Sequence, residues 1–145
     1  MRKKTFLALV ILSGMALMAV APAFAQDRVE ATIPFAFNVG STTLPAGQYE
    51  VRPVLAKALV IQNQATNQAA MTLVMSASPK AISEADQALL VFHKYGDRCF
   101  LSEIRTWDNT KTVSASKLER ETAKEASEAA VNTPSRDVYV AAFTH

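Results

Sequence analysis

The sequence feature that most constrains the fold is an alternation of apolar with polar or small side chains, repeated in several short runs. The alternation has a period of two over residues 35–39, 49–53 and 71–75. Successive side chains on a strand point to opposite sides of a sheet, so this period is typical of strands with one buried face. In each run we expect the larger apolar side chains to face the core, including Met71, Leu73 and Met75 of the third run.

Continuous apolar runs complete the set of expected strands, at 58–61, 89–92, 100–101 and 138–143. Turn-forming residues separate the strands at 44–47, 64–67 and 95–98, and a longer loop is expected at 78–86. Pro34 and Pro53 should lie at strand ends, bulges or edges, because proline cannot donate to a ladder. Turns spaced about 8–12 residues apart predict a mainly β fold: an antiparallel β-sandwich or a small β-barrel of about eight strands.

One segment, residues 114–131, departs from this pattern. Alanine, glutamate and lysine favour a helix there, Ser116 and Glu119 have the spacing of a capping box, and Pro134 follows the end. We expect a surface helix near 116–130, with a frayed connector as the alternative. Its charged residues are expected to form solvated pairs, and they are Lys117, Glu119, Arg120, Glu121, Lys124, Glu125 and Glu128.

The N-terminus has the three parts of a secretory signal peptide. Arg2, Lys3 and Lys4 precede an apolar run over 6–20, and small residues lead to a cleavage site after Ala25. We expect residues 1–25 to be removed and residues 26–145 to form a single β domain outside the cytosol, periplasmic or extracellular. The alternative is an uncleaved anchor, because residues 5–26 carry no charge.

The charge balance excludes some partners. The chain of 145 residues has 15 Lys and Arg against 13 Asp and Glu, but three of the basic residues lie in the signal peptide, which leaves the processed chain near −1. That balance gives no electrostatic case for binding of nucleic acid or anionic lipid. We expect no nucleic-acid partner, and contact with a membrane only transiently, through the signal peptide. A single cysteine, Cys99, excludes an internal disulfide.

Three segments together resemble a family of small exported proteins of unknown function from soil bacteria. The first reads Ile-Pro-Phe-Ala-Phe-Asn-Val-Gly from Ile33, followed by Leu-Pro-Ala-Gly-Gln-Tyr from Leu44. The second runs over 91–104 and the third over 116–120. The resemblance implies export and a compact β fold, and it implies no catalytic or binding residues. In the pattern of that family an aromatic residue is expected where this chain has Cys99.

The hairpin around Gly96 and Asp97 decides whether His93 and Cys99 form a nucleophile–base pair. A two-residue turn places His93 opposite Phe100, with Cys99 on the other face of the sheet. A three-residue loop places His93 across from Cys99, although Asp97 in the turn is then badly placed to orient the imidazole. We expect a histidine held by a neighbour and a cysteine that acts as a small apolar residue.

Other chemical motifs are weak. A zinc site would need three or four close ligands, and the chain has only His93 and His145 as histidines. Residues 114–117 match the Ser-x-x-Lys string of penicillin-recognising enzymes without its companion motifs, and Ser116 as a helix cap explains the string better. We therefore expect no catalytic, cofactor-binding or metal residues. The remaining surface or cavity candidates are His93, Tyr95, Asp97, Glu103 and Trp107.

The function most consistent with these features is a non-catalytic binding or structural module of the cell envelope, without a cofactor. Its partner would be an envelope protein or a small molecule. Two alternatives remain open. One is a small envelope hydrolase that uses His93, Asp97 and Glu103. The other is a carrier that holds an apolar ligand in a barrel cavity lined by aromatic residues.

Overall fold

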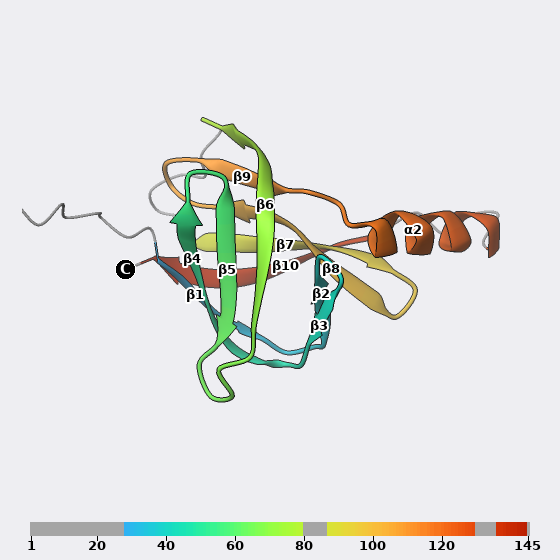
Figure 1. The fold of residues 1–145 in the computed structure, drawn as a ribbon, viewed down its shortest axis with the longest axis horizontal. Helices are drawn as coiled ribbons and strands as arrows, with labels where there is room; N and C mark the ends of the chain where they lie inside the picture. The colour runs from blue at the N-terminus through green and yellow to red at the C-terminus, as the bar shows by residue number, and fades with distance from the viewer. Residues whose placement is uncertain (1–27, 80–86, 130–135, 145) are drawn as a thin grey trace, which may run out of the picture.

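The computed structural model describes residues 28–79, 87–129 and 136–144, which form a curled β-sheet with one helix on its outside (Figure 1). The predicted signal peptide and its cleavage site at Ala25 lie outside the described residues. The elements are β1 (Val29–Ile33), β2 (Phe37–Val39), β3 (Thr42–Leu44), β4 (Gly47–Leu55), β5 (Ala58–Asn63), β6 (Ala69–Ser78), β7 (Ala88–Tyr95), β8 (Arg98–Arg105), β9 (Thr110–Val113), α2 (Lys117–Ala129) and β10 (Arg136–Thr144).

Eight of the strands in the described ranges close into an antiparallel barrel, in the order β8-β7-β10-β1-β4-β5-β6-β9 and back to β8. The prediction of a mainly β fold with one helix is confirmed, and the closure of the sheet decides for the barrel over the sandwich. The remaining hairpin, β2–β3, attaches to β8 through a parallel pairing of Asn38 with Phe100. Asn38 strengthens that attachment, because its Nδ2 donates to the carbonyl of Cys99 at 3.1 Å.

Several predicted turns and irregularities are confirmed. The β7–β8 hairpin has the two-residue turn, which pairs His93 with Phe100 and Lys94 with Cys99. Gly96 occupies that turn at a φ of 59°, where a side chain would be strained. Pro53 lies at a register shift between β4 and β5, as expected of a proline within a strand. The expected loop at 78–86 lies mostly outside the described residues.

Aromatic rings fill the inside of the barrel. Phe37 contacts Tyr49 and Phe92 edge to face, with ring centroids 5.0 and 5.3 Å apart, and all three side chains are fully buried. The Tyr49 hydroxyl donates to the carbonyl of Pro45 at 2.5 Å, so the one polar group on these three rings has a partner. The rings therefore form a packed core, as expected of most such aromatic residues.

The inward and outward faces of strand β6 are the reverse of those predicted. Thr72 faces the inside and is 7% exposed, whereas Met71, Leu73 and Met75 are 61%, 60% and 69% exposed. The expectation that these three apolar residues face the core was wrong. The reason is the register that β6 inherits from β5, in which Leu59 is buried and pairs with Thr72.

The turn between β5 and β6 holds that register. Asn63 is buried, and its Oδ1 accepts hydrogen bonds from the backbone N–H groups of Ala65 and Thr66, both at 2.9 Å. Since a slip of one residue exchanges the two faces of a strand, this turn fixes which side chains of β6 reach the core. In the register that follows this turn, Thr72 faces the core and Leu73 faces outward.

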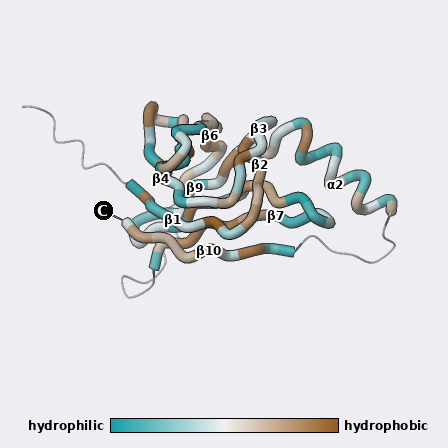
Figure 2. Tube along the Cα trace, turned by 90° about the horizontal axis from the view of Figure 1, so that it is seen from below, coloured by the Kyte–Doolittle hydropathy of each residue, from teal (hydrophilic) through white to brown (hydrophobic). Residues whose placement is uncertain are grey.

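Helix α2 projects away from the barrel, as Figures 1 and 2 both show. Ser116 caps its start, since the Ser116 Oγ accepts the N–H of Glu119 at 3.1 Å. Two of the predicted solvated pairs are present, Lys117 with Glu121 at 3.6 Å and Lys124 with Glu128 at 3.8 Å. No helix among the described residues is long and apolar enough to cross a membrane.

Candidate functional site

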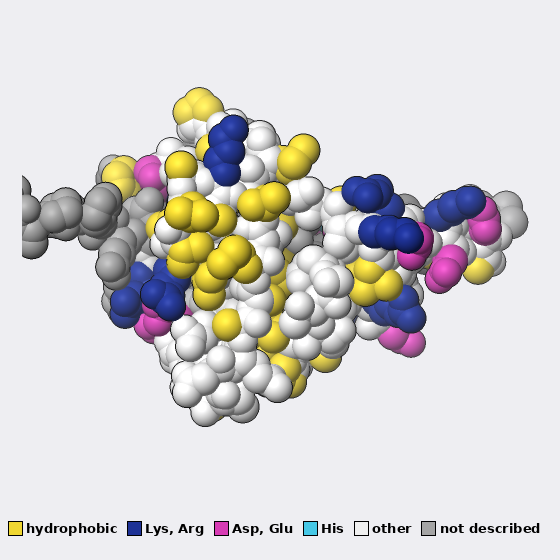
Figure 3. All heavy atoms as spheres, in the orientation of Figure 1, with side chains coloured by type: hydrophobic (Ala, Val, Ile, Leu, Met, Phe, Trp, Pro, Cys, Tyr) yellow, Lys and Arg dark blue, Asp and Glu magenta, His cyan; other side chains and the backbone are white. Residues whose placement is uncertain are grey.

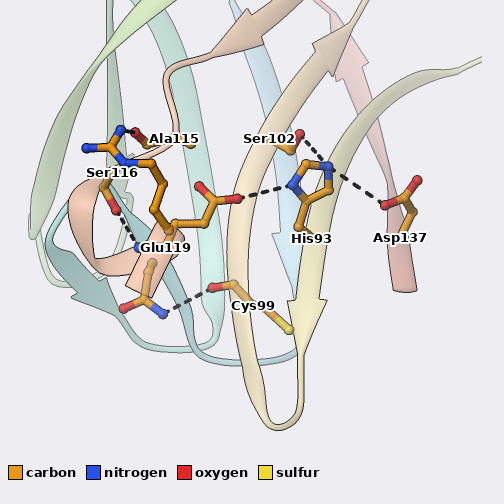
Figure 4. Close-up of polar contacts among 9 residues, drawn as sticks. His93, Cys99, Ser102, Ala115, Ser116, Glu119 and Asp137 are labelled. Atoms are coloured by element: carbon orange, nitrogen blue, oxygen red, sulfur yellow. Dashed lines mark hydrogen bonds and ion pairs between the residues drawn. The ribbon is translucent and has the colours of Figure 1, made fainter. Parts of the chain in front are cut away.

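Four polar side chains from four elements meet on the outer wall of the barrel, and we call them the His93 cluster (Figure 4). His93 lies on β7, Ser102 on β8, Glu119 on α2 and Asp137 on β10. Nδ1 of His93 is 3.1 Å from Oε1 of Glu119, and Nε2 of His93 is 3.0 Å from Oγ of Ser102. Asp137 is farther from the imidazole, with its Oδ1 3.8 Å from Nε2.

A β-bulge positions the serine. Val91 pairs with Glu103 and the next residue, Phe92, pairs with Leu101, so Ser102 is the extra residue of β8. A bulge changes the direction of a side chain relative to regular alternation. Ser102 thereby reaches the outer face beside His93, while Leu101 and Ile104 on either side remain in the core.

Glu119 is the unexpected member of the cluster. In a reciprocal capping box its carboxylate would turn back to the N–H of Ser116. Here the carboxylate contacts His93 instead, and its side chain is only 8% exposed. The prediction of a solvated helix pair was therefore wrong for Glu119, because the first turn of α2 packs against the wall of the barrel.

The order serine, imidazole, carboxylate is that of a nucleophile with its base and the group that orients the base. Burial limits this reading, since Ser102 is 6% exposed while the His93 side chain is 36% exposed. A reacting carbonyl would have to approach a hydroxyl that is almost covered. The contacts themselves fasten α2 to β7 and β8, and Arg98 adds another link by donating to Oγ1 of Thr122 at 3.2 Å.

Tyr95 borders the cluster on the same face of β7. Its ring lies edge-on to His93 at 6.2 Å and to Phe100 at 5.9 Å. Burial raises the pKa of Tyr95, and the negative charges of Glu119 and Asp137 raise it further. The phenol therefore remains protonated to higher pH than an exposed tyrosine, and its charge plays no part near neutral pH.

The structure does not bring the other sequence-predicted residues to His93. Asp97 lies exposed in the hairpin turn, and Glu103 binds Arg105, with its Oε2 2.9 Å from Nε and 2.7 Å from Nη2. Trp107 is exposed beyond the end of β8. Among the described residues, the polar partners of His93 are those of the His93 cluster. The predicted set of His93, Asp97 and Glu103 is therefore not assembled in this fold.

Cys99 points into the core, away from the cluster, as Figure 4 shows. Burial raises the pKa of its thiol, against a smaller opposing effect of Lys94. A buried thiol of this kind is poorly suited to act as a nucleophile. Within the described ranges, His, Cys, Asp and Glu side chains form no group of three that could hold a metal ion.

The sequence did not single out Ser102, Glu119 or Asp137 as members of a site. Ser102 and Glu119 belong to the segments that carry the family resemblance, and Glu119 was expected only to cap the helix and to form a solvated pair. The direction of the Ser102 side chain depends on a β-bulge, and no turn-forming residue in the sequence indicates that bulge. The burial of Glu119 depends on where the helix packs, which its thin apolar face does not indicate.

A second feature is an exposed apolar surface over β4, β5 and β6, visible at the centre of Figure 3. We call it the apolar outer face and define it by its large exposed side chains, which are Val54, Leu55, Met71, Leu73 and Met75. The strands pair so that Leu73 lies beside Ala58, which in turn pairs with Leu55. Residues 51–79 contain no Asp or Glu, and their charged residues are Arg52 and Lys57.

Comparison of the chain with protein-family models, curated proteins and solved structures gives no match.

Proposed function

We propose that this protein is an exported, non-catalytic binding module of the cell envelope that engages its partner through the apolar outer face. The observation that carries the proposal is the outward turn of Met71, Leu73 and Met75 on β6. Large contiguous apolar surfaces are rare on soluble monomers, and they mark sites of interaction with a protein or a membrane. Flexible methionine side chains suit such surfaces because they adapt to irregular partners.

Covering the apolar outer face with a partner is energetically favourable. Removing one Leu or Met side chain fully from water contributes about 1.5–3 kcal/mol. Leu55 and Leu73, at 70% and 60% exposed, leave most of that stabilisation unused in the isolated chain. A partner that covers this face gains that stabilisation when it buries the two leucine side chains. The packed rings of Phe37, Tyr49 and Phe92 favour this outer surface over a cavity carrier, because they occupy the inside of the barrel.

Thiol labelling in the producing cell tests the proposal. In a Cys99→Ala background, Leu73→Cys places a thiol on the apolar outer face and Glu121→Cys places one on the exposed side of α2. We expect a maleimide to label Leu73→Cys rapidly in the purified protein and slowly in the cell envelope. Glu121→Cys should react at the same rate in both. Equal rates for Leu73→Cys in the two settings would contradict the proposal.

A second candidate function is hydrolysis of a small ester at the His93 cluster. It is favoured by the two distances of 3.0 and 3.1 Å that join Ser102 to His93 and His93 to Glu119. Hydrolysis is the second candidate because Ser102 is buried. A fluorophosphonate probe separates the two functions: a hydrolase carries a covalent adduct on Ser102 that His93→Ala abolishes. A binding module stays unlabelled while remaining folded.

A further inference from the structure

We infer that the partner of the apolar outer face is an anionic lipid bilayer surface. The inference rests on the proposed function, because it takes this face to be the binding surface. Three features of the molecule point to this partner: the shape of the β4–β5 tip, the distribution of charge, and the point at which the chain enters the barrel.

The tip of the β4–β5 hairpin and the neighbouring part of β6 form one apolar projection. Leu55 lies at the end of β4, and the hairpin turns through Ala56 and Lys57. The N–H of Val74 donates to the carbonyl of Lys57 at 2.9 Å, so β6 is joined directly to the tip. Leu55, Leu73 and Met75 are therefore held together on a rigid scaffold. Interfacial proteins bury apolar side chains of this kind shallowly among lipid headgroups.

Both charged residues of the segment that forms the projection are basic. Residues 51–79 carry Arg52 and Lys57 and no carboxylate. The nearest preceding acidic residue in the chain, Glu50, lies opposite Glu30 and forms ion pairs, with its Oε1 3.1 Å from Nε of Arg28 and 3.8 Å from Nε of Arg52. Arg52 belongs to this group of paired charges, and Lys57 at the tip lies outside it. The net charge of the processed chain, near −1, conceals this separation. An apolar projection with a lysine at its tip is complementary to anionic headgroups.

The same charges argue against a second copy as the occupant. A two-fold interface places the same surface of both chains face to face. It would place Lys57 of both copies in one interface, with no Asp or Glu from residues 51–79 to compensate them. Desolvating like charges in this way is unfavourable.

The chain also enters the barrel at this corner. Arg28 contacts Glu50, and Val29 pairs with Val51 on β4, the strand that leads to Leu55. The apolar run at 6–20 ends eight positions before Arg28, which is about 28 Å at full extension. While that run lies in a membrane, the barrel is therefore held within reach of the bilayer at the edge of the strand that carries the projection.

Vesicle co-sedimentation tests the inference on the folded chain 26–145, which contains every described residue. The vesicles contain phosphatidylglycerol with phosphatidylethanolamine, or phosphatidylcholine alone. We expect the protein to pellet with the anionic vesicles at low salt and to be released by high salt, because exposed charges are screened. Lys57→Glu should weaken binding at least about tenfold, since it reverses one charge.

Leu73→Asp should weaken binding by a similar factor, about tenfold, because it removes an inserted apolar side chain. Phe143→Asp is the matched control: it replaces an exposed apolar residue on β10, outside the apolar outer face, and should bind like the parent. Circular dichroism checks that each variant is folded. Lys57→Glu, in an exposed turn, keeps the test decisive if Leu73→Asp does not fold.

Three results would overturn the inference. They are a parent protein that stays in the supernatant with anionic vesicles, binding that Lys57→Glu leaves unchanged, and a dimer in sedimentation that Leu73→Asp dissolves. If vesicle binding fails while Leu73→Cys remains protected in the cell envelope, the proposed function stands and its partner is a protein. If both fail, the proposed function falls as well.

Discussion

Oε1 of Glu119 lies 3.1 Å from Nδ1 of His93, and this contact joins the first turn of α2 to the wall of the barrel across 26 positions of the chain. The same glutamate contributes its N–H to the cap formed by Ser116. Glu119 thus takes part in the cap of α2 and also fixes the helix to β7. Helix α2 has little apolar surface of its own, so its attachment depends on this polar contact.

Replacing Glu119 by alanine should detach the start of α2. The change leaves the buried side of His93 without its carboxylate, which costs about 1–3 kcal/mol of the free energy of unfolding. Urea unfolding measures the loss, and hydrogen exchange should show faster exchange of the amides of α2 than of the barrel strands. Glu121→Ala removes only an exposed pair with Lys117 and should cost less than about 0.5 kcal/mol. Equal losses in the two variants would contradict the role of Glu119.

Phe92→Ala should destabilise the whole barrel. The ring of Phe92 is fully buried and contacts Phe35 and Phe37, with ring centroids 5.3 Å away in each case. The cavity left behind should cost about 3–5 kcal/mol. Thermal or urea unfolding checks this value, with the exposed Phe143→Ala as the comparison. A loss below about 1 kcal/mol would place Phe92 at the surface.

We expect ionisation of Tyr95 to lower the free energy of unfolding at alkaline pH. Burial and the charges of Glu119 and Asp137 raise its pKa, so the folded state favours the protonated phenol. This stabilisation is present below the unfolded pKa of about 10 and is lost as the pH rises through the folded value. Tyr95→Phe should therefore lose less stability than the parent when urea unfolding is compared at pH 9 and pH 11, values on either side of about 10. An identical alkaline loss in both proteins would contradict the assignment.

Cys99 should be unreactive while the protein is folded. Its side chain lies in the core, and burial raises the pKa of the thiol, so little thiolate is available. Alkylation followed by mass spectrometry should show slow modification in buffer and fast modification in urea. Reducing agent should leave the melting temperature unchanged, because one cysteine forms no internal disulfide. Fast modification of the folded protein would place the thiol outside the core.

Local sequence signals located most of the elements, but they missed the short strands β1, β3 and β9 and gave the wrong faces for β6. Gly96 and the polar run at 64–67 correctly predicted two turns, because backbone conformation at a turn depends on its own residues. The face of β6 depends on pairing with β5, where Leu59 lies beside Thr72 and Asn63 holds the turn. The period of two predicted that the side chains of β6 alternate between the two faces, but it did not predict which set faces the core.

The His93 cluster was only half accessible to sequence reasoning. The hairpin geometry correctly separated His93 from Cys99, because a two-residue turn fixes the register of its strands. The bulge at Ser102 and the packing of Glu119 arise from contacts between elements distant in the chain. No spacing in the sequence reports those contacts, so the sequence alone does not group Ser102 and Glu119 with His93.

The most direct test of the account compares two neighbouring positions on β6. In a Cys99→Ala background, the maleimide labelling rates of Leu73→Cys and Thr72→Cys are measured in the purified, folded protein. The account predicts rapid labelling at Leu73→Cys and protection at Thr72→Cys until the protein is unfolded, because only the first side chain points to solvent. The reverse order would return Leu73 to the core and remove the surface on which the proposed function depends.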